Sequence, residues 1–325
     1  MAIPLGVPEQ HAPAPVGDPA SGTQEVEGRS LLQIAWSRLR RDRAAIAGLV
    51  AVVLLVLVAA LAPVLTWING YPPNQFNPGT INAALGGLPK GSFGGVSSEH
   101  WLGVEPKSGR DIFSRVVWGA RVSLLIAVGA TGVSIVLGTV FGILAGYVGG
   151  AVDSAISRLM DVLLSFPSLI FMIALVSVLP EANRELLLIF VIGFFGWSYV
   201  GRIVRGQTLS LARREFVEAA RSLGASTRYI IFRELLPNLA GPILVVTTLT
   251  IPTYIATEAA LSFLGVGVRP PTPSWGQMLF SAVNWYQVDP FYFAVPGVCL
   301  FITVLAFNLL GDGLRDALEP RGGGS

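Results

Sequence analysis

Few side chains in this 325-residue sequence are of the types that do chemistry. The single cysteine, Cys299, excludes an intrachain disulfide and any cysteine-based metal cluster. The two histidines, His11 in a proline-rich tail and His100 in a long polar loop, lie too far apart to form a convincing pair. The glycine-rich stretch 86–92 lacks the Gly-x-x-x-x-Gly-Lys-Ser/Thr spacing of a phosphate-binding loop. We therefore predict no catalytic residue, no metal site and no ATPase site in this chain.

One carboxylate, Glu258, falls inside an apolar stretch, near its outer end. Ion-coupled carriers place ionisable groups inside their membrane spans to bind protons or sodium. Other charges inside the apolar stretches are scarce, so we interpret Glu258 as an interfacial carboxylate or as a hydrogen-bonding group near a gate. An ion-coupled secondary transporter is the alternative, and substrate-independent proton uptake would favour it.

The composition indicates which elements position these residues. Charged residues make up 13% of the chain and apolar residues 52%, against roughly 25% and 45–50% in ordinary soluble domains. Because so few charges cannot cover an aqueous surface, a soluble enzyme is excluded. The formal net charge of +2 is too small to indicate nucleic-acid binding. The predicted fold class is all-α transmembrane.

A membrane-spanning helix needs about 20 predominantly apolar residues. Six stretches meet this requirement, at residues 44–65, within 122–152, and at 162–179, 186–201, 239–263 and 291–310. The second contains Gly138, Gly142 and Gly146 at four-residue spacing, which predicts close approach of a neighbouring helix. Pro167 and Pro252, in the third and fifth stretches, are expected to act as hinges or to shape a cavity.

The loops carry Lys and Arg asymmetrically, which predicts cytoplasmic N- and C-termini. Fourteen basic residues fall on the side of the termini: Arg29, Arg38, Arg40, Arg41, Arg43, Arg158, Arg205, Arg213, Arg214, Arg221, Arg228, Arg233, Arg315 and Arg321. Six fall on the opposite side: Lys90, Lys107, Arg110, Arg115, Arg184 and Arg269.

These patterns predict a domain organisation with one membrane-embedded core. The first segment, 1–28, has five prolines and is expected to be a disordered cytoplasmic tail, and it lacks the pattern of a secretory signal. The other segments are an anchor helix at 29–65, an extracytoplasmic loop at 66–117, a core at 118–311 with a cytoplasmic loop at 202–238, and a cytoplasmic tail at 312–325. Residues 322–325 resemble an engineered linker scar.

The cytoplasmic loop 202–238 is strongly charged and yet helix-patterned. Residues 213–223 are predicted to form a short helix, whose apolar stripe consists of Phe216, Ala219, Ala220 and Leu223. Gly224 is expected to end it in a left-handed turn, and Ser226 or Thr227 to cap a second helix that Pro237 closes. Such a unit must bury its stripe under the bundle or in a partner's groove.

The opposite side of the membrane is predicted to hold two long loops, 66–117 and 264–290. Trp275, Trp285, Tyr286 and Tyr292 suit an aromatic belt at the membrane interface. The other interpretation is an outer rim that meets a partner delivering substrate. The candidate residues for this rim or for a gate are Arg110, Asp111, Glu258 and Trp275.

Several segments resemble one family, the ABC importer permeases. Glu218-Ala219-Ala220, then Gly224, then Leu236-Pro237 is similar to that family's EAA loop, although Glu234 stands where an isoleucine is usual. Further segments resemble the dipeptide/oligopeptide permease C-type subunit, in the same order along the chain: 38–63, 100–103, 109–115, 119–124, 258–265, 273–276 and 308–316.

The resemblance implies a fold and a set of partners. The fold would be the six-helix bundle of a type I ABC importer permease in the bacterial inner membrane. The partners would be a B-type permease subunit, two ABC ATPase subunits that bind ATP and Mg, and an extracytoplasmic solute-binding protein, with no nucleic acid and no cofactor in this chain. The ATPase-coupling residues would be Glu218, Ala219, Ala220, Arg221, Leu223, Gly224, Leu236 and Pro237.

On this resemblance, peptides would cross by alternating access driven by the partner ATPases. Relatives that import nickel chelates or haem leave the cargo open. A scaffold without transport is a further alternative, which predicts that the chain neither retains ATPase subunits nor supports their ATP hydrolysis.

Overall fold

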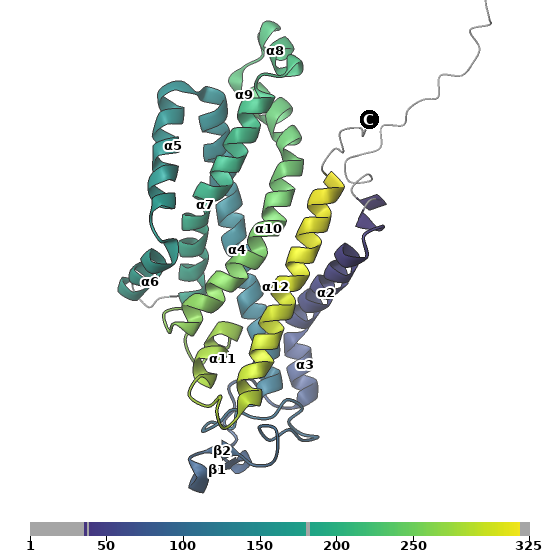
Figure 1. Cartoon of the computed structure of the whole chain (residues 1–325), viewed down its shortest axis with the longest axis vertical. Helices are drawn as coiled ribbons and strands as arrows, with labels where there is room; N and C mark the ends of the chain where they lie inside the picture. The colour runs from purple at the N-terminus through teal and green to yellow at the C-terminus, as the bar shows by residue number, and fades with distance from the viewer. Residues whose placement is uncertain (1–35, 38, 180–182, 319–325) are drawn as a thin grey trace, which may run out of the picture.

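Long helices run through most of the structure, a computed structural model that describes residues 36–37, 39–179 and 183–318 (Figure 1). The expectations for segments 1–28 and 322–325 lie outside these residues. The α-helices are α2 (Arg43–Ala60), α3 (Ala62–Asn69), α4 (Ile112–Ile143), α5 (Gly150–Ser165), α6 (Ser168–Val178), α7 (Arg184–Leu211), α8 (Glu215–Ser222), α9 (Thr227–Tyr229), α10 (Leu236–Phe263), α11 (Trp275–Ala282) and α12 (Pro290–Leu318).

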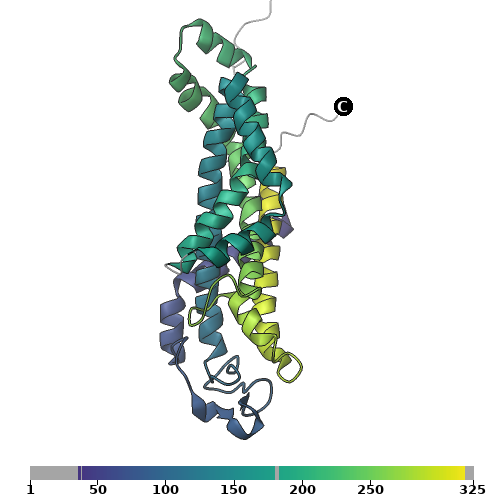
Figure 2. The same cartoon turned by 90° about the vertical axis from the view of Figure 1, so that its left-hand side faces the viewer.

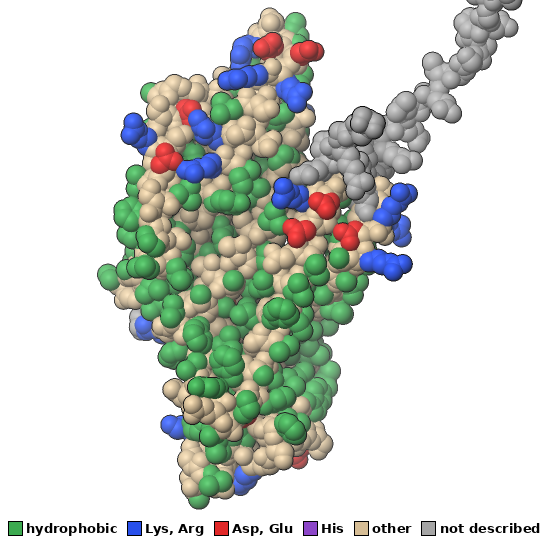
Figure 3. All heavy atoms as spheres, in the orientation of Figure 1, with side chains coloured by type: hydrophobic (Ala, Val, Ile, Leu, Met, Phe, Trp, Pro, Cys, Tyr) green, Lys and Arg blue, Asp and Glu red, His purple; other side chains and the backbone are tan. Residues whose placement is uncertain are grey.

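Five of the described helices are long and apolar enough to cross a membrane, and the bent pair α5–α6 can make a sixth. Apolar side chains cover most of the middle of the face shown in Figure 3, whereas most charged side chains lie toward the end that carries α8. Figure 2 shows the α8 and α9 segment at one end of the molecule and irregular loops at the other, which we call the loop end. The predicted all-α transmembrane class is confirmed.

The loop end is built between α3 and α4. It contains an antiparallel pair of short strands, β1 (Ile81–Asn82) and β2 (Leu88–Pro89); one 3-10 turn, η1 (Pro78–Thr80), precedes β1, and another, η2 (Ala83–Leu85), lies between the two strands. Ile81 pairs with Pro89 and Asn82 with Leu88. The α4 helix then starts at Ile112, inside the segment 66–117 that was predicted as a loop.

Helices α4 and α7 make the most extensive packing contact in the described chain. A β-carbon at Gly138, Gly142 or Gly146 would lie 2.6–2.8 Å from side-chain carbons of α7. The facing residues of α7, Val200, Val204 and Thr208, follow the same four-residue spacing. The predicted close approach at the glycines is therefore confirmed, and its partner is α7.

The third predicted span is not one straight helix. The pair α5–α6 bends by 87°, and the break falls at Phe166 and Pro167. Proline restricts the residue before it to extended conformations, and Phe166 has φ −89° and ψ 145°. The predicted span over 162–179 is therefore not one helix, because α5 ends at Ser165 and α6 begins after Pro167; the break falls at the proline for which a hinge or cavity-shaping role was expected, and the adjacent Phe166 and Ser168 line a cavity.

The expectation that Pro237 closes the second helix of the cytoplasmic loop is wrong. Helical structure runs without a break from Thr227 to Phe263. A π-helical segment, η4 (Ile230–Leu235), precedes Pro237, which lies in the first turn of α10. In this segment the N–H of Leu236 bonds to the carbonyl oxygen of Ile231, five residues back, so the ordinary hydrogen-bond pattern is already shifted where Pro237 has no N–H, and the helix continues. A second π-helical segment, η3 (Leu144–Val148), ends α4.

Candidate functional site

The α8 helix stands at the extreme end of the molecule, beyond the long helices (Figure 1). Its Val217 is fully buried and belongs to a hydrophobic cluster with Ile230 and Leu235 of η4. This contact fixes α8 against the start of the α9–η4–α10 helix. The short helix is therefore held by one apolar side chain on the inner face.

The predicted apolar stripe of α8 does not turn inward. Leu223 is 89% exposed, and Phe216 and Ala219 are also exposed, while Ala220 is half-buried against the cluster around Val217. The residue that does pack inward, Val217, lies between the predicted positions. Large apolar side chains exposed at a helix tip are typical of a surface that a partner covers.

The turn after α8 follows the expected geometry. Gly224 has φ +78°, and its N–H donates to the carbonyl oxygen of Arg221 at 3.0 Å. The next N–H, of Ala225, donates to the carbonyl oxygen of Ala220 at 3.0 Å, which completes a Schellman-type cap. Ser226 Oγ then accepts from the N–H of Tyr229 and caps α9. The predicted left-handed turn and the Ser226 cap are both confirmed.

The remaining predicted coupling residues surround this turn. Glu218 is exposed, and the guanidinium of Arg221 lies over the ring of Tyr147 at 5.7 Å from its centroid. Leu236 is half-buried and Pro237 is exposed, and both lie at the start of α10. The structure thus places all eight residues in α8, its turn and the first turn of α10.

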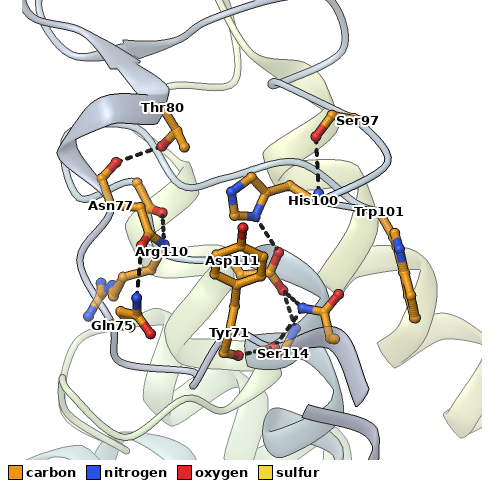
Figure 4. Close-up of polar contacts among 12 residues, drawn as sticks. Tyr71, Gln75, Asn77, Thr80, Ser97, His100, Trp101, Arg110, Asp111 and Ser114 are labelled. Carbon is orange, nitrogen blue, oxygen red and sulfur yellow. Dashed lines mark hydrogen bonds and ion pairs between the residues drawn. The ribbon is translucent and has the colours of Figure 1, made fainter. Parts of the chain in front are cut away.

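At the loop end, Asp111 is buried and caps α4. Its Oδ1 accepts from the N–H of Ser114 at 2.8 Å and from the side-chain amide of Asn69 at 3.0 Å. Its Oδ2 lies 2.9 Å from Nδ1 of His100. Figure 4 shows His100, Asp111 and Ser114 grouped beside Tyr71, whose carbonyl oxygen accepts from Ser114 Oγ. Asp111 therefore ties the irregular segment before α4 to the first turn of α4.

Arg110 belongs to a second cluster, built around Glu105. Nε of Arg110 lies 2.6 Å from one carboxylate oxygen of Glu105, and Nε of Arg115 lies 2.6 Å from the other. The hydroxyl of Tyr292 donates to Glu105 at 3.0 Å. Arg115 is fully buried and also donates to the Gln277 side chain at 2.9 Å. A buried arginine paired in this way joins the loop that carries Glu105 to α4, α11 and α12.

Sequence reasoning missed Glu105 and Arg115 as members of this cluster. Nothing in their immediate neighbours marks them, because their partners Gln277 and Tyr292 lie far along the chain. The one signal is that both are charged residues in the segment leading into a predicted span, where a charge that becomes buried needs a partner. Burial also raises the pKa of nearby Asp289, whose carboxylate accepts from the N–H of Tyr292.

Glu258 is fully buried and is surrounded by serine hydroxyls. Ser262 donates to one of its oxygens at 2.7 Å, Ser123 of α4 donates to the other at 2.8 Å, and Ser274 also bonds to it. Each of these hydroxyls accepts a backbone N–H, from Val268, Trp275 and Gln277 respectively. With Ser262 and Ser123 donating to its two oxygens, the Glu258 carboxylate is the acceptor of this cluster.

The four aromatic residues predicted for an interfacial belt divide into two groups. Trp275 and Tyr292 are buried, and the indole N–H of Trp275 donates to the carbonyl oxygen of Val116 at 3.1 Å. Tyr286 is exposed and Trp285 half-exposed, with Lys107 over its ring. The prediction of an interfacial belt is therefore wrong for Trp275 and Tyr292, which serve as core residues of the loop end.

The predicted sites thus fall at opposite ends of the bundle. Among the four rim candidates, Glu258 and Trp275 meet at Ser123, whereas Arg110 and Asp111 belong to the two neighbouring clusters. No group of three or more His, Cys, Asp or Glu side chains that could hold a metal ion occurs in the described residues.

Two hollows of similar volume lie between these ends. One, of about 640 Å³, is bounded by the α5–α6 bend, α7, α10 and α12, and includes Tyr199, Thr253, Thr257 and Asn308 in its lining. We call it the polar cavity. The other, of about 680 Å³, is bounded by α4, α6 and α7 and is lined by glycine, valine, leucine and phenylalanine alone. We call it the apolar groove.

Family models match the chain at two places. The model described as "Binding-protein-dependent transport system inner membrane component" matches residues 138–322, which is more than half of the chain. The chain belongs to this family. In this permease a second model, described as "N-terminal TM domain of oligopeptide transport permease C", matches residues 30–84.

Curated relatives match the permease over nearly its whole length. The dipeptide transport system permease protein DppC of Alkalihalophilus pseudofirmus is 37% identical and covers 98% of this chain and 97% of the relative. The oligopeptide transport system permease protein OppC of Escherichia coli K12 is 43% identical, and the match covers 91% of this chain and 93% of the relative. The glutathione transport system permease protein GsiD of another Escherichia coli strain is 42% identical, and the match covers 88% of this chain and 89% of the relative.

A solved structure shares the fold of the permease. The MetNI methionine ABC transporter, in inward-facing conformations, matches with a TM-score of 0.52 and 20% identity. The match covers 63% of this chain and 97% of that chain. This likeness confirms the predicted fold of an ABC importer permease.

The hydroxyls around Glu258 predict the effect of an isosteric change in the permease. Glu258→Gln replaces one acceptor by an NH2 donor that faces a serine already committed to donate. We expect the change to lower the unfolding free energy by about 2 kcal/mol or more, as for a hydrogen bond to a charged group left unmade. The measurement is thermal unfolding of the purified protein in detergent.

The matched control is Asp312→Asn, the same chemical change on an exposed carboxylate of α12. It should leave the unfolding temperature unchanged. Equal unfolding temperatures for Glu258→Gln and the unsubstituted protein would contradict the acceptor role of Glu258.

Proposed function

We propose that this chain is the transmembrane permease subunit of an ATP-driven importer for peptides in the bacterial inner membrane. The observation that carries the proposal is the 37–43% identity, over most of both chains, to permeases named for dipeptide, oligopeptide and glutathione transport. All three named cargoes are peptides. The buried state of Glu258, saturated by hydroxyls, gives no support to the alternative of an ion-coupled carrier.

We infer that the chain works with four kinds of partner. These are a B-type permease subunit, two ABC ATPase subunits that bind ATP and Mg, an extracytoplasmic solute-binding protein and the lipid bilayer. The chain itself would be non-catalytic, and both termini would be cytoplasmic. The exposed Phe216 and Leu223 at the tip of α8 support a protein partner at that end.

The proposed mechanism is alternating access, with α8 as the coupling helix. Val217 and the Gly224 turn hold α8 against a helix that runs from Thr227 to Phe263. A partner that moves α8 therefore moves α10. The same helix borders the polar cavity at Thr253 and Thr257 and carries Glu258 at the loop end. Movement of α8 would in this way reach both the cavity and the outer closure.

Reconstitution tests the function. The chain, its proposed permease and ATPase partners and the binding protein are placed in proteoliposomes with ATP, and peptide uptake is measured. ATP-dependent uptake of Ala-Ala, tri-alanine or glutathione is expected. Uptake that is independent of ATP and is driven by a proton gradient would instead support the ion-coupled alternative.

A single charge reversal tests the role of α8. Glu218→Lys reverses an exposed charge on α8. We expect uptake to fall about tenfold or more while membrane insertion stays intact, because like charges brought together at an interface cost several kcal/mol. ATP hydrolysis by the complex is measured in parallel and should continue without uptake. Asp312→Lys, an equal change outside α8, is the control; normal uptake by Glu218→Lys would remove α8 from the coupling pathway.

A further inference from the structure

The polar cavity and the apolar groove differ in what their walls can bind. Hydrogen-bonding side chains in the polar cavity come from three long helices and from the α5–α6 bend, and they are Ser168, Tyr199, Thr253, Tyr254, Thr257 and Asn308. All of them are uncharged. The hydroxyl of Tyr254 is already bonded to that of Ser134 at 2.6 Å. The apolar groove has no hydrogen-bonding side chain in its lining. A water-borne solute therefore fits the first hollow and a hydrocarbon surface fits the second.

Asn308 is the strongest sign of a polar occupant. It lies in the spanning helix α12 and is exposed. Its amide has no hydrogen-bond partner among the described residues of the chain. Lipid hydrocarbon cannot satisfy an amide, and polar side chains within spans face a protein interior or a water-filled path. The same argument applies to Tyr199, which is more than half exposed on α7.

The hydrogen-bonding capacity that remains in the cavity is of both kinds. The hydroxyl of Thr257 donates to the carbonyl oxygen of Thr253 at 2.8 Å, and that of Thr253 donates to the carbonyl oxygen of Leu249 at 3.3 Å. These two hydroxyls can therefore only accept from a ligand. Asn308 offers two N–H donors and a carbonyl acceptor, and Tyr199 offers a hydroxyl donor.

This inventory matches the main chain of a peptide. Each peptide unit presents one N–H donor and one carbonyl acceptor, and a primary amide can bind both at once. No Asp, Glu, Lys or Arg lines the polar cavity, so its wall has no charge that could distinguish the side chains or the termini of one peptide from those of another.

We propose that the polar cavity is the surface along which this subunit contacts the transported solute. The contact is made to main-chain amides, with Asn308 as the paired donor and acceptor and Thr253 and Thr257 as acceptors. This inference rests on the proposed function. Within the chain, selection by side-chain charge would then play no part at this surface.

The first test measures access to water and charge, and it needs no knowledge of the cargo. Cys299, the single native cysteine, is replaced by alanine, and Thr257→Cys is introduced into the whole transport complex in membranes. Two methanethiosulfonates of similar size are applied, one cationic and one anionic. Both are expected to react, whereas Val136→Cys, on an exposed position of the apolar groove, should stay unmodified.

Adding Asn308→Asp to the Thr257→Cys protein places a charge in the cavity. We expect the ratio of cationic to anionic labelling rates to rise about tenfold, as a nearby charge does in a confined site. An unchanged ratio would place Asn308 outside the solute path. No labelling of Thr257→Cys by either reagent would show that another protein surface covers the cavity, and would overturn the proposal.

The second test concerns the amide contact itself. Asn308→Leu removes donor and acceptor at similar volume and should lower ATP-dependent uptake about tenfold, the loss expected for about one hydrogen-bonded pair, while complex yield and the labelling of Thr257→Cys are unchanged. Asn308→Gln keeps both groups and should retain part of the uptake. Full uptake by Asn308→Leu would refute the main-chain contact.

The two proposals fail separately. If the unsubstituted complex imports a peptide with ATP but Thr257→Cys does not react, only the role of the cavity is lost. If Thr257→Cys reacts with both reagents but Ala-Ala, tri-alanine and glutathione are not imported, the cavity is water-filled as proposed, and the proposal of peptide import is refuted.

Discussion

Gly224→Pro is expected to abolish solute uptake while leaving the protein inserted in the membrane. Proline fixes φ near −65°, whereas Gly224 has φ +78°, and proline also removes the N–H that donates to Arg221. The turn cannot form, so α8 loses its direction relative to the helix that begins at Thr227. The long helices do not depend on this turn and should fold as before.

The measurements are uptake, ATP hydrolysis and the amount of chain in the membrane. We expect uptake to fall to background, since a misdirected α8 cannot transmit movement, with insertion close to normal. Gly224→Asn is the matched control, because asparagine tolerates a left-handed conformation better than other residues with a β-carbon. It should retain most of the uptake. Near-normal uptake by Gly224→Pro would exclude a role for this turn in coupling.

Gly142→Leu is expected to prevent assembly of the bundle. A β-carbon at Gly142 would lie 2.8 Å from the carbonyl oxygen of Gly201 and 2.8 Å from Cβ of Val204, so α4 and α7 would have to separate. Overpacking a close contact costs about 1–3 kcal/mol and more where backbone is struck. The same face includes Gly138 and Gly146, so the helices cannot shift along each other to relieve the clash.

Gly132→Leu, on the same helix, is the control. Nothing lies within 4 Å of a β-carbon built at Gly132, so the chain should fold with that side chain. The yield of monodisperse protein and its thermal unfolding separate the two variants. Equal yields would show that the α4–α7 contact is looser than the structure has it.

Hydropathy and residue spacing predicted the parts of the fold that are local. Five of the spans, the glycine face of α4 and the Gly224 turn each depend on a few neighbouring residues, and the structure contains them; the third span is present as the bent pair α5–α6. Proline was harder to interpret. Pro167 breaks a span and Pro237 does not, because the first follows an extended residue and the second follows a π-helical segment in which the hydrogen-bond pattern is already shifted.

The polar clusters of the loop end could not be predicted in the same way. Glu105 bonds to Tyr292, and Arg115 bonds to Gln277. The partners lie so far apart in the sequence that no periodic pattern of residues connects them. Glu258 was recognised as unusual from its apolar surroundings alone. Its three serine partners come from α4, from α10 and from the start of α11, and only the packing of these elements brings them together.

The unbroken helix from Thr227 to Phe263 has a mechanical consequence. Its 37 residues at 1.5 Å each make a rod about 55 Å long. If the rod pivots near one end, a tilt of about 5° displaces the other end by about 5 Å, close to one helical turn. A small displacement at one end of the helix is therefore enough to move the other end. The ratio of the two displacements depends on where along the helix the bundle places the pivot. Pro242 and Pro252 lie within this helix, and bending at either proline would reduce the displacement that reaches the far end.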